Sequence, residues 1–162
     1  MPDTFDQVIS RIMQPIEQMT MGPLDTTYLM RSDGAFVYVE GYWHPGDTAI
    51  GKLIYYPDPK GSTDIHGRKY SSIIKEERDG KTAYVSHKDQ IKKLYRLYPE
   101  LPPDSHKLSL CEYQVAFPRS SFAGFFNDRR ALEYVMDHFP KVGEIVRQAS
   151  ELFEVPLKRL GI

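Results

Sequence analysis

The segment from residue 27 to residue 56 most strongly constrains the fold, because its apolar residues follow a period of two. An aromatic and β-branched run at 35–40 follows the turn signal Ser-Asp-Gly at 32–34, and a second run at 50–56 follows His-Pro-Gly-Asp at 44–47. Alternation of this kind between tight turns is typical of β-strands. We therefore expect three antiparallel strands in this segment.

A different periodicity opens the chain. Apolar residues recur at spacings of three and four behind Asp3 or Thr4, either of which can cap a helix: Phe5, Val8, Ile9, Ile12 and Ile16. This spacing predicts an amphipathic helix that runs towards Pro15. We expect its apolar face to lie on the sheet.

A second helical pattern follows the strand region. Ser86, with Asp89 three residues later, resembles a capping box, and the apolar stripe behind it consists of Ile91, Leu94, Tyr95 and Tyr98. The combination predicts a helix that begins at residue 86 or 87.

The C-terminal third contains two more helical patterns, separated by a proline. The first begins at Asn127 or Asp128 and runs through Phe139, where Pro140 ends it. The second has the clearest apolar stripe of the sequence: Val142, Ile145, Val146, Ala149, Leu152 and Phe153. With the strands, these patterns predict an α+β fold, an antiparallel sheet of about four to six strands with an N-terminal helix and a C-terminal helical pair.

Turn signals place the remaining connections. We expect an exposed loop at 57–61, a turn at 64–67 before a short strand at 68–70, and a turn at 77–80. Three prolines in 99–104 form a rigid connection and the best candidate for an internal boundary. Because the strand at 110–117 is expected to return to the same sheet, we treat residues 1–162 as a single α+β domain.

Composition excludes several classes of protein. The chain has 162 residues, 41% hydrophobic, and its 27% charged residues balance to a net charge of -1, so no global basic field argues for nucleic acid. The lone cysteine, Cys111, cannot form an intrachain bridge, which suits a reducing compartment, and the N-terminus lacks a signal-peptide profile. We expect a cytoplasmic protein without a membrane span.

Patterns that carry catalysis are largely missing. The five histidines do not fall in a paired ligand spacing, no Gly-x-Ser-x-Gly or phosphate-binding glycine loop occurs, and no cofactor or metal is expected. Glu77 and Asp79 form an acid-x-acid pattern, but charged residues and Gly80 flank it, as in a solvated turn. A pairing of His44 with Asp47 or Asp64 as acid and base is the remaining enzymatic option.

A binding surface has better support, because aromatic and basic residues interleave between residues 43 and 70. The candidate binding residues are His44, Lys52, Tyr55, Lys60, Arg68 and Tyr70. Aromatic rings can stack on bases while Lys and Arg meet phosphates. The alternative is that the tyrosines fill the core and the cations only solvate the outer face. Strand alternation also separates Lys52 from Leu53 and Ile54 from Tyr55, so the residues cannot all share one surface.

These same motifs carry a resemblance to a known family. The order of His44-Pro45, then Tyr55 with Pro57-Asp-Pro-Lys-Gly61, then Gly67-Arg-Lys-Tyr70, resembles the N-terminal region of predicted nucleotidyltransferases of the DNA polymerase beta superfamily. Weaker similarity follows at 115–119 and 152–162. In that family the catalytic Gly-Ser motif and metal-binding carboxylates come next, and none of them can be carried over to a position here. The resemblance therefore implies a region that precedes a catalytic domain and does not transfer nucleotides alone.

Two functions remain open from the sequence. The first is a non-catalytic accessory domain that binds RNA or a nucleotide for a nucleotidyltransferase domain supplied in cis or in trans. The second is a structural or protein-interaction domain that docks through its C-terminal helix against another chain or, as a homo-oligomer, another copy.

Overall fold

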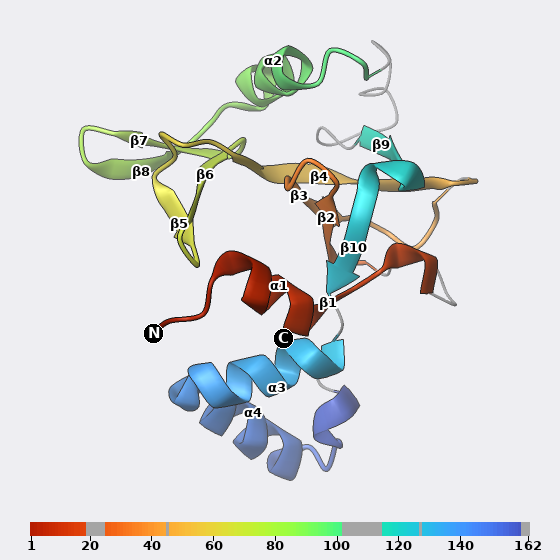
Figure 1. The fold of residues 1–162 in the computed structure, drawn as a ribbon, viewed down its shortest axis with the longest axis vertical. Coiled ribbons are helices and arrows are strands. Elements are labelled where there is room, and N and C mark those ends of the chain that lie inside the picture. Colours follow the sequence, from red (N-terminus) through yellow and green to blue (C-terminus); the bar gives the residue numbers. More distant parts are fainter. Residues whose placement is uncertain (19–24, 45, 102–114, 127, 160–162) are drawn as a thin grey trace. The chain divides into compact units, whose positions relative to one another are not determined.

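The computed structural model describes residues 1–18, 25–44, 46–101, 115–126 and 128–159 (Figure 1). The chain forms two compact units, Pro15–Phe125 and a second built from Met1–Gln14 with Phe126–Ile162. Their boundaries lie near residues 14 and 125 and not in the proline-rich segment 99–104. The expected α+β class is confirmed, with an N-terminal helix, an antiparallel sheet and a C-terminal helical pair. Whether residues 1–162 act as one domain stays a prediction.

The first unit, called the sheet unit below, is organised around the long strand β4 (Thr48–Pro57). The strand order is β10-β2-β3-β4-β6-β5, with β9 also paired to β4, and every one of these pairings is antiparallel. The other members are β2 (Tyr28–Arg31), β3 (Phe36–Val39), β5 (Thr63–Ile65), β6 (Arg68–Ser72), β9 (Val115–Pro118) and β10 (Phe122–Phe126). The three strands expected in 27–56 are therefore confirmed.

The connection between β2 and β3 shows why the sequence turns there. Gly34 has φ +87°, a left-handed conformation that glycine adopts without strain. Its N–H donates to the carbonyl of Arg31 at 2.8 Å, and the Asp33 carboxylate accepts from the N–H of Ala35 at 3.0 Å. The Ser-Asp-Gly segment therefore connects the two strands in a tight turn that local hydrogen bonds stabilise.

Two further hairpins also turn at a glycine with positive φ, but there the preceding residue has positive φ as well. His66 and Gly67 have φ of 47° and 84° between β5 and β6, and Asp79 and Gly80 have φ of 51° and 72° between β7 and β8. Two consecutive positive φ values define the type I′ turn that matches the twist of paired strands. Strands β7 (Lys75–Arg78) and β8 (Lys81–Tyr84) pair with each other as a separate two-stranded sheet.

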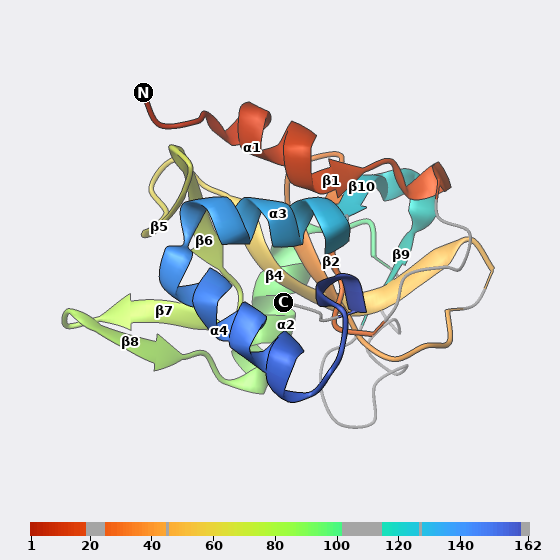
Figure 2. The same ribbon diagram turned by 90° about the horizontal axis from the view of Figure 1, so that it is seen from below.

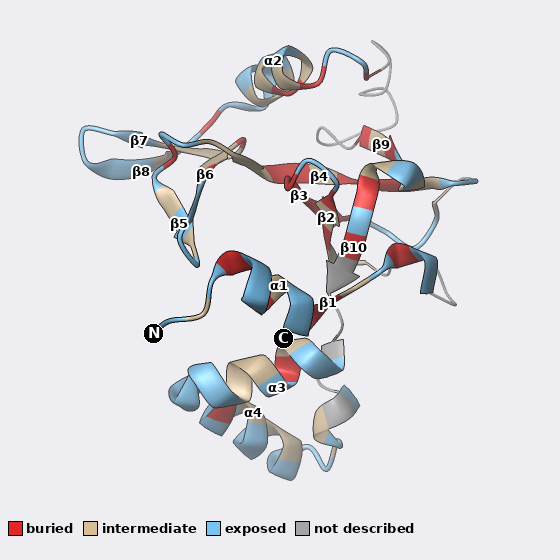
Figure 3. Cartoon of the chain, in the orientation of Figure 1, coloured by how far each residue is buried: buried red, intermediate tan, exposed pale blue. Residues whose placement is uncertain are grey.

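Helix α2 (His87–Leu97) begins at Ser86, whose hydroxyl accepts from the N–H of Asp89, as expected. Leu94 and Tyr98 are buried in one cluster with residues of the sheet, including Leu53 and Phe117, and Ile91 and Tyr95 pack against it. Figure 3 shows buried positions along β4 and β9, the strands that carry Leu53 and Phe117. The expected strand 110–117 is observed from Val115 onward, where β9 pairs with β4; Cys111 lies outside the described residues. Elements η1 (Ile16–Gln18) and η3 (Arg119–Ser121) are single turns of this unit.

The second unit, called the helical unit, contains α1 (Phe5–Ile12), β1 (Met13–Gln14), α3 (Asp128–His138), α4 (Pro140–Leu152) and η4 (Leu157–Arg159). Figure 2 shows α3 and α4 side by side. Pro140 both ends α3 and starts α4, because a proline at the first helical position has no N–H to satisfy.

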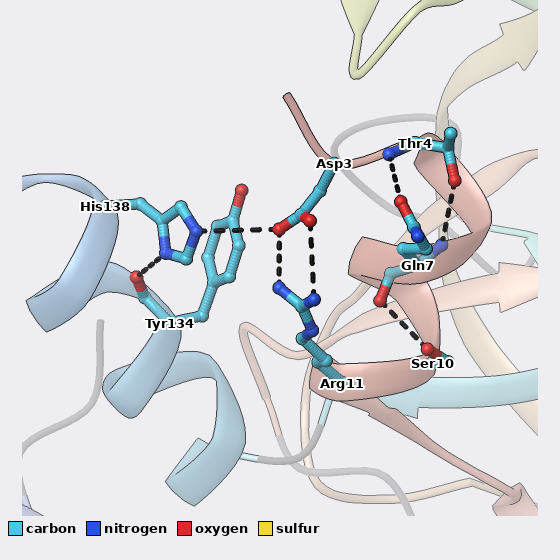
Figure 4. Close-up of polar contacts among 7 residues, drawn as sticks. All are labelled: Asp3, Thr4, Gln7, Ser10, Arg11, Tyr134 and His138. Atoms are coloured by element: carbon cyan, nitrogen blue, oxygen red, sulfur yellow. Dashed lines mark hydrogen bonds and ion pairs between the residues drawn. The ribbon is translucent and has the colours of Figure 1, made fainter. Parts of the chain in front are cut away.

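Helix α1 is confirmed, and its cap is a capping box: Thr4 accepts from the N–H of Gln7, and the Gln7 side chain accepts from the N–H of Thr4 at 2.8 Å. Its described packing partner in this unit is α3. Asp3 links the two helices, because its carboxylate lies 2.5 Å from Arg11 and 3.6 Å from His138 (Figure 4). The N-terminal helix is thus grouped with the C-terminal pair rather than with the sheet.

Candidate functional site

A cavity in the sheet unit has a volume of about 520 Å³. Its lining combines three tyrosines, two isoleucines and four other polar residues: Tyr28, Tyr38, Tyr84, Ile54, Ile74, Glu40, Lys52, His87 and Gln90. This volume lies within the usual range for small-molecule sites, and a few polar groups among apolar and aromatic walls are typical of them. We call it the tyrosine cavity.

Strand register explains why the first wall forms. Tyr28 of β2 pairs with Tyr38 of β3, and Tyr38 pairs with Lys52 of β4, so the three side chains lie in a row across the sheet. The rings of Tyr28 and Tyr38 meet edge to face, with centroids 5.2 Å apart. Glu40 lies two residues beyond Tyr38 and so shares its face.

Lys52 and Glu40 form the charged part of this wall. Lys52 Nζ lies 2.5 Å from Glu40 Oε1, and the two side chains are 15% and 21% exposed. Each charge of this poorly hydrated pair stabilises the other, because either charge alone would carry an uncompensated desolvation cost. Lys52 is therefore already committed to a carboxylate, and the cavity presents a neutral pair of adjacent donor and acceptor groups.

Tyr28 is a neutral hydroxyl at physiological pH. Burial raises the pKa of Tyr28, and the neighbouring phenols of Tyr38 and Tyr55 raise it further. Its hydroxyl can therefore donate as well as accept a hydrogen bond in the cavity.

A second part of the lining comes from the last residue of β8, Tyr84, and from His87 and Gln90 in the first turn of α2. Gln90 is anchored by its Nε2, which donates to the carbonyl of Val85 at 2.7 Å, leaving its carboxamide oxygen as an acceptor. Tyr84 is 75% exposed, and Lys75 Nζ lies 5.5 Å from the centre of its ring. Tyr84 is thus a lining residue that is open to solvent.

The structure separates the six residues that the sequence groups together. Lys52 lines the tyrosine cavity, while Lys60 is exposed in the turn before β5 and Arg68 is exposed at the start of β6. Tyr70 is buried in the sheet unit with its ring 5.5 Å from that of Phe36, so the ring is closed to stacking by a ligand. For Tyr70, the core interpretation of the aromatic residues is the one that fits.

Tyr55 belongs to a second, smaller cavity of about 210 Å³, lined also by Ser62, Thr63, Ser72, Thr82, Lys75, Glu76 and Glu77. Two of its hydroxyls already have internal partners: Ser72 Oγ donates to Ile54 O at 3.2 Å, and Thr82 Oγ1 donates to Glu77 at 2.8 Å. Its volume also lies below the range of about 300–1,000 Å³ that is usual for small-molecule sites, which makes it a weaker candidate for a ligand than the tyrosine cavity.

A β-bulge changes the faces that simple alternation assigns. Val37 pairs with Leu53 but Phe36 pairs with Tyr55, so Ile54 is an extra residue in β4. Because the partners of Lys52 and Tyr55 are Tyr38 and Phe36, two residues apart on β3, Lys52 and Tyr55 share a face. Strict alternation would place them on opposite faces.

His44 has a local structural role. Its Nδ1 accepts the N–H of Ile50 at 3.0 Å, which closes the connection into β4, so the neutral ring carries its proton on Nε2. Asp64, one of its suggested catalytic partners, caps a turn by accepting from the N–H of Gly67 at 2.8 Å, and this bond lowers the pKa of Asp64. Both groups thus serve the backbone, which leaves the acid and base option without a supporting contact in the described part of the chain.

The motif at 57–61 also has a structural explanation. The carboxylate of Asp58 accepts from the N–H of Lys60 at 2.9 Å and from the hydroxyl of Ser71 at 2.7 Å, which folds the loop onto β6. At Gly61 a Cβ atom would lie 2.0 Å from the carbonyl oxygen of Tyr70, so only glycine fits. These residues need no ligand to account for them.

Tyr28, Tyr38, Glu40 and His87 line the cavity, although the sequence does not single them out. The signal for two of them is present, because Tyr38 and Glu40 lie two residues apart in a predicted strand and must share a face. The contribution of His87 and Gln90 depends on where α2 begins relative to the sheet, which no local pattern indicates.

Within the described ranges, no helix has the length and apolar character needed to cross a membrane. No group of three or more His, Cys, Asp or Glu side chains in the same ranges is arranged to hold a metal ion. Comparison with protein-family models, with curated proteins and with solved structures finds no match. The resemblance to nucleotidyltransferases and the cytoplasmic location therefore stay predictions.

Proposed function

We propose that the sheet unit is a non-catalytic binding module whose tyrosine cavity receives the base of a nucleotide or of an RNA. The observation that carries this proposal is the combination of tyrosine walls with the neutralised Lys52–Glu40 pair in one cavity of about 520 Å³. A nucleobase has a flat face and a polar edge, and the cavity offers a counterpart to each.

The tyrosine rings suit the flat face, because aromatic side chains stack on any base with a gain of about 1–3 kcal/mol per base. The Lys52–Glu40 pair suits the edge, since nucleobases carry hydrogen-bond donors and acceptors side by side. The ammonium of Lys52 only donates and the carboxylate of Glu40 only accepts, so together they match such an edge.

The charge state of the cavity gives the proposal a measurable signature. Because Lys52 is already paired, burying a base there releases few counterions, and binding of an uncharged nucleoside should depend weakly on salt. Any added affinity of the phosphorylated form should fall as salt rises, since it comes from cations outside the cavity.

The resemblance supplies the remaining part of the proposal. A module of this kind presents its ligand to a nucleotidyltransferase domain in cis or in trans, which carries the magnesium-binding carboxylates. The sheet unit contributes recognition and no chemical step.

The test is binding of the four ribonucleosides, their triphosphates and short RNAs to the full chain, measured by calorimetry at two salt concentrations. The key variant is Lys52→Met with Glu40→Gln, which removes both charges without leaving either unpaired. We expect it to abolish nucleoside binding, while Lys60→Ala and Arg68→Ala, which lie outside the cavity, leave nucleoside affinity unchanged. Absence of nucleoside binding by the unmodified chain, or equal binding by the double variant, would overturn the proposal.

A further inference from the structure

The outer face of α4 is an exposed apolar stripe in the helical unit. Val142, Ile145 and Leu152 are 41%, 65% and 76% exposed, and Ala149 lies between them on the same side. The neighbouring face of α4 is occupied by α3, because a Cβ at Gly143 would lie 3.2 Å from the Cα of Met136. The stripe is thus separate from the contact that holds α4 to α3.

The spacing of the stripe is that of a coiled-coil seam. Residues 142, 145, 149 and 152 follow steps of three, four and three, which correspond to positions a, d, a and d of a heptad. An amphipathic helix that only covers its own core presents its seam inward, whereas this seam points to solvent. The pattern therefore indicates a second helix as its partner.

The charges of α4 run against its own dipole. Its first turn has no acidic residue but contains Lys141, and its last turn has no basic residue but contains Glu151, followed by Glu154. An isolated helix prefers the opposite arrangement, with acids at the positive N-terminus and bases at the negative C-terminus. The same charges become favourable if each end of α4 lies beside the opposite end of another helix.

We propose that α4 pairs antiparallel with α4 of a second copy of this chain. In that arrangement Val142 of one copy packs with Leu152 of the other, and Ile145 packs with Ala149, so the four seam positions form matched layers about a two-fold axis. Lys141 of each copy then lies level with Glu151 and Glu154 of the other. The proposal is independent of any ligand in the tyrosine cavity.

The first test is the mass of the full chain by analytical ultracentrifugation across a wide range of concentration. We expect a reversible dimer, and Ile145→Glu should weaken it about tenfold or more, because the charge enters the centre of the seam. Ile145 is largely exposed, so the variant should keep its helical circular dichroism. A monomer at every concentration, or a dimer unaffected by Ile145→Glu, overturns the proposal.

Charge reversal tests the antiparallel direction. Lys141→Glu should weaken the dimer by setting acid against acid, and adding Glu151→Lys with Glu154→Lys should restore it. In a parallel pair Lys141 would face Lys141, and its reversal would not be rescued by changes at the other end. Failure of the triple variant to recover dimerisation would therefore rule out the antiparallel form.

Disulfide trapping tests the register. In a Cys111→Ser background, chains with Ile145→Cys mixed with chains with Ala149→Cys should crosslink on mild oxidation more readily than either variant alone. Preferential crosslinking of Ile145→Cys with itself would show a parallel seam and overturn the proposed geometry.

Discussion

Two cations in the sheet unit are almost equally removed from water but are held in different ways. The side chain of Arg31 is 10% exposed, and its guanidinium lies 4.6 Å from the ring centre of Tyr98 and 4.8 Å from that of Phe117. The side chain of Lys52 is 15% exposed, but it faces the tyrosine cavity beside Glu40. Arg31 is closed in by rings, whereas Lys52 borders open space.

The difference separates a charge that stabilises from a charge that can recognise. The donors of Arg31 are directed to Asp33 and Glu100, and its faces are covered by aromatic rings, so no surface is left for a ligand. Lys52 and Glu40 neutralise each other and still border the cavity. Burial of a cation therefore does not by itself indicate a site; the space beside it does.

The largest expected effect concerns Arg31, the cation that is covered by aromatic rings. Arg31→Met should lower the free energy of unfolding by about 2 kcal/mol, because it removes a cation that is 10% exposed from two aromatic rings, together with its weaker ion pairs to the exposed carboxylates of Asp33 and Glu100. Urea denaturation measures the change. Arg78→Met is the matched control: Arg78 pairs with Glu76 but is 67% exposed, so its loss should cost less than about 0.5 kcal/mol. Equal losses in the two variants would contradict the distinction.

The loop 57–61 contains a second position, Gly61, that has no space for a ligand or a side chain. Gly61→Ala should destabilise the chain by about 2 kcal/mol, because the added Cβ meets backbone atoms of Tyr70 that cannot move aside. Lys60→Ala, one residue earlier on the exposed side of the same turn, should leave the urea midpoint unchanged. A neutral Gly61→Ala would mean that the loop is open in solution and would reopen a binding role for this motif.

A double-mutant cycle on Lys52 and Glu40 tests the ion pair that borders the tyrosine cavity. Lys52→Met alone should cost about 1–2 kcal/mol, because it leaves a poorly hydrated carboxylate without its partner, and adding Glu40→Gln should recover most of that loss. The same double variant should lose nucleoside binding. If the pair served stability alone, the double variant would keep its nucleoside binding.

Sequence patterns predict the elements of this protein well, because strands, caps and turns depend on residues close together in the chain. The turn at Gly34, the cap at Ser86 and the proline between α3 and α4 all occur where the sequence signals them. These features are decided by backbone conformation and local hydrogen bonds, which the nearest residues determine.

The cavity could be predicted only in part, because it depends on register and on a bulge. The sequence predicts Lys52 as a cation beside aromatic residues, but its partner Glu40 directly follows the neighbouring strand β3. The extra residue Ile54 also places Tyr55 on the same face as Lys52, and a strict period-two pattern does not predict this bulge. Long-range pairing therefore decides which of the aromatic and basic residues form a site.

The smallest expected effect concerns a third way of holding a charge, by hydrogen bonds from neutral donors. The Ser71 hydroxyl and then the N–H of Lys60 lower the pKa of Asp58. Ser71→Ala removes the first of these donors, so the pKa of Asp58 should rise towards its ordinary value, which an NMR titration of the carboxyl carbon detects. A depressed folded pKa favours the native state above the unfolded pKa, and that contribution disappears as pH falls through the folded value. Ser71→Ala should therefore lose less stability than the unmodified chain between neutral pH and strong acid.

Ser62→Ala is the control, because Ser62 is an exposed serine of the following turn and the substitution should leave the pKa of Asp58 unchanged. An unchanged pKa in Ser71→Ala would show that the backbone donor alone holds this carboxylate.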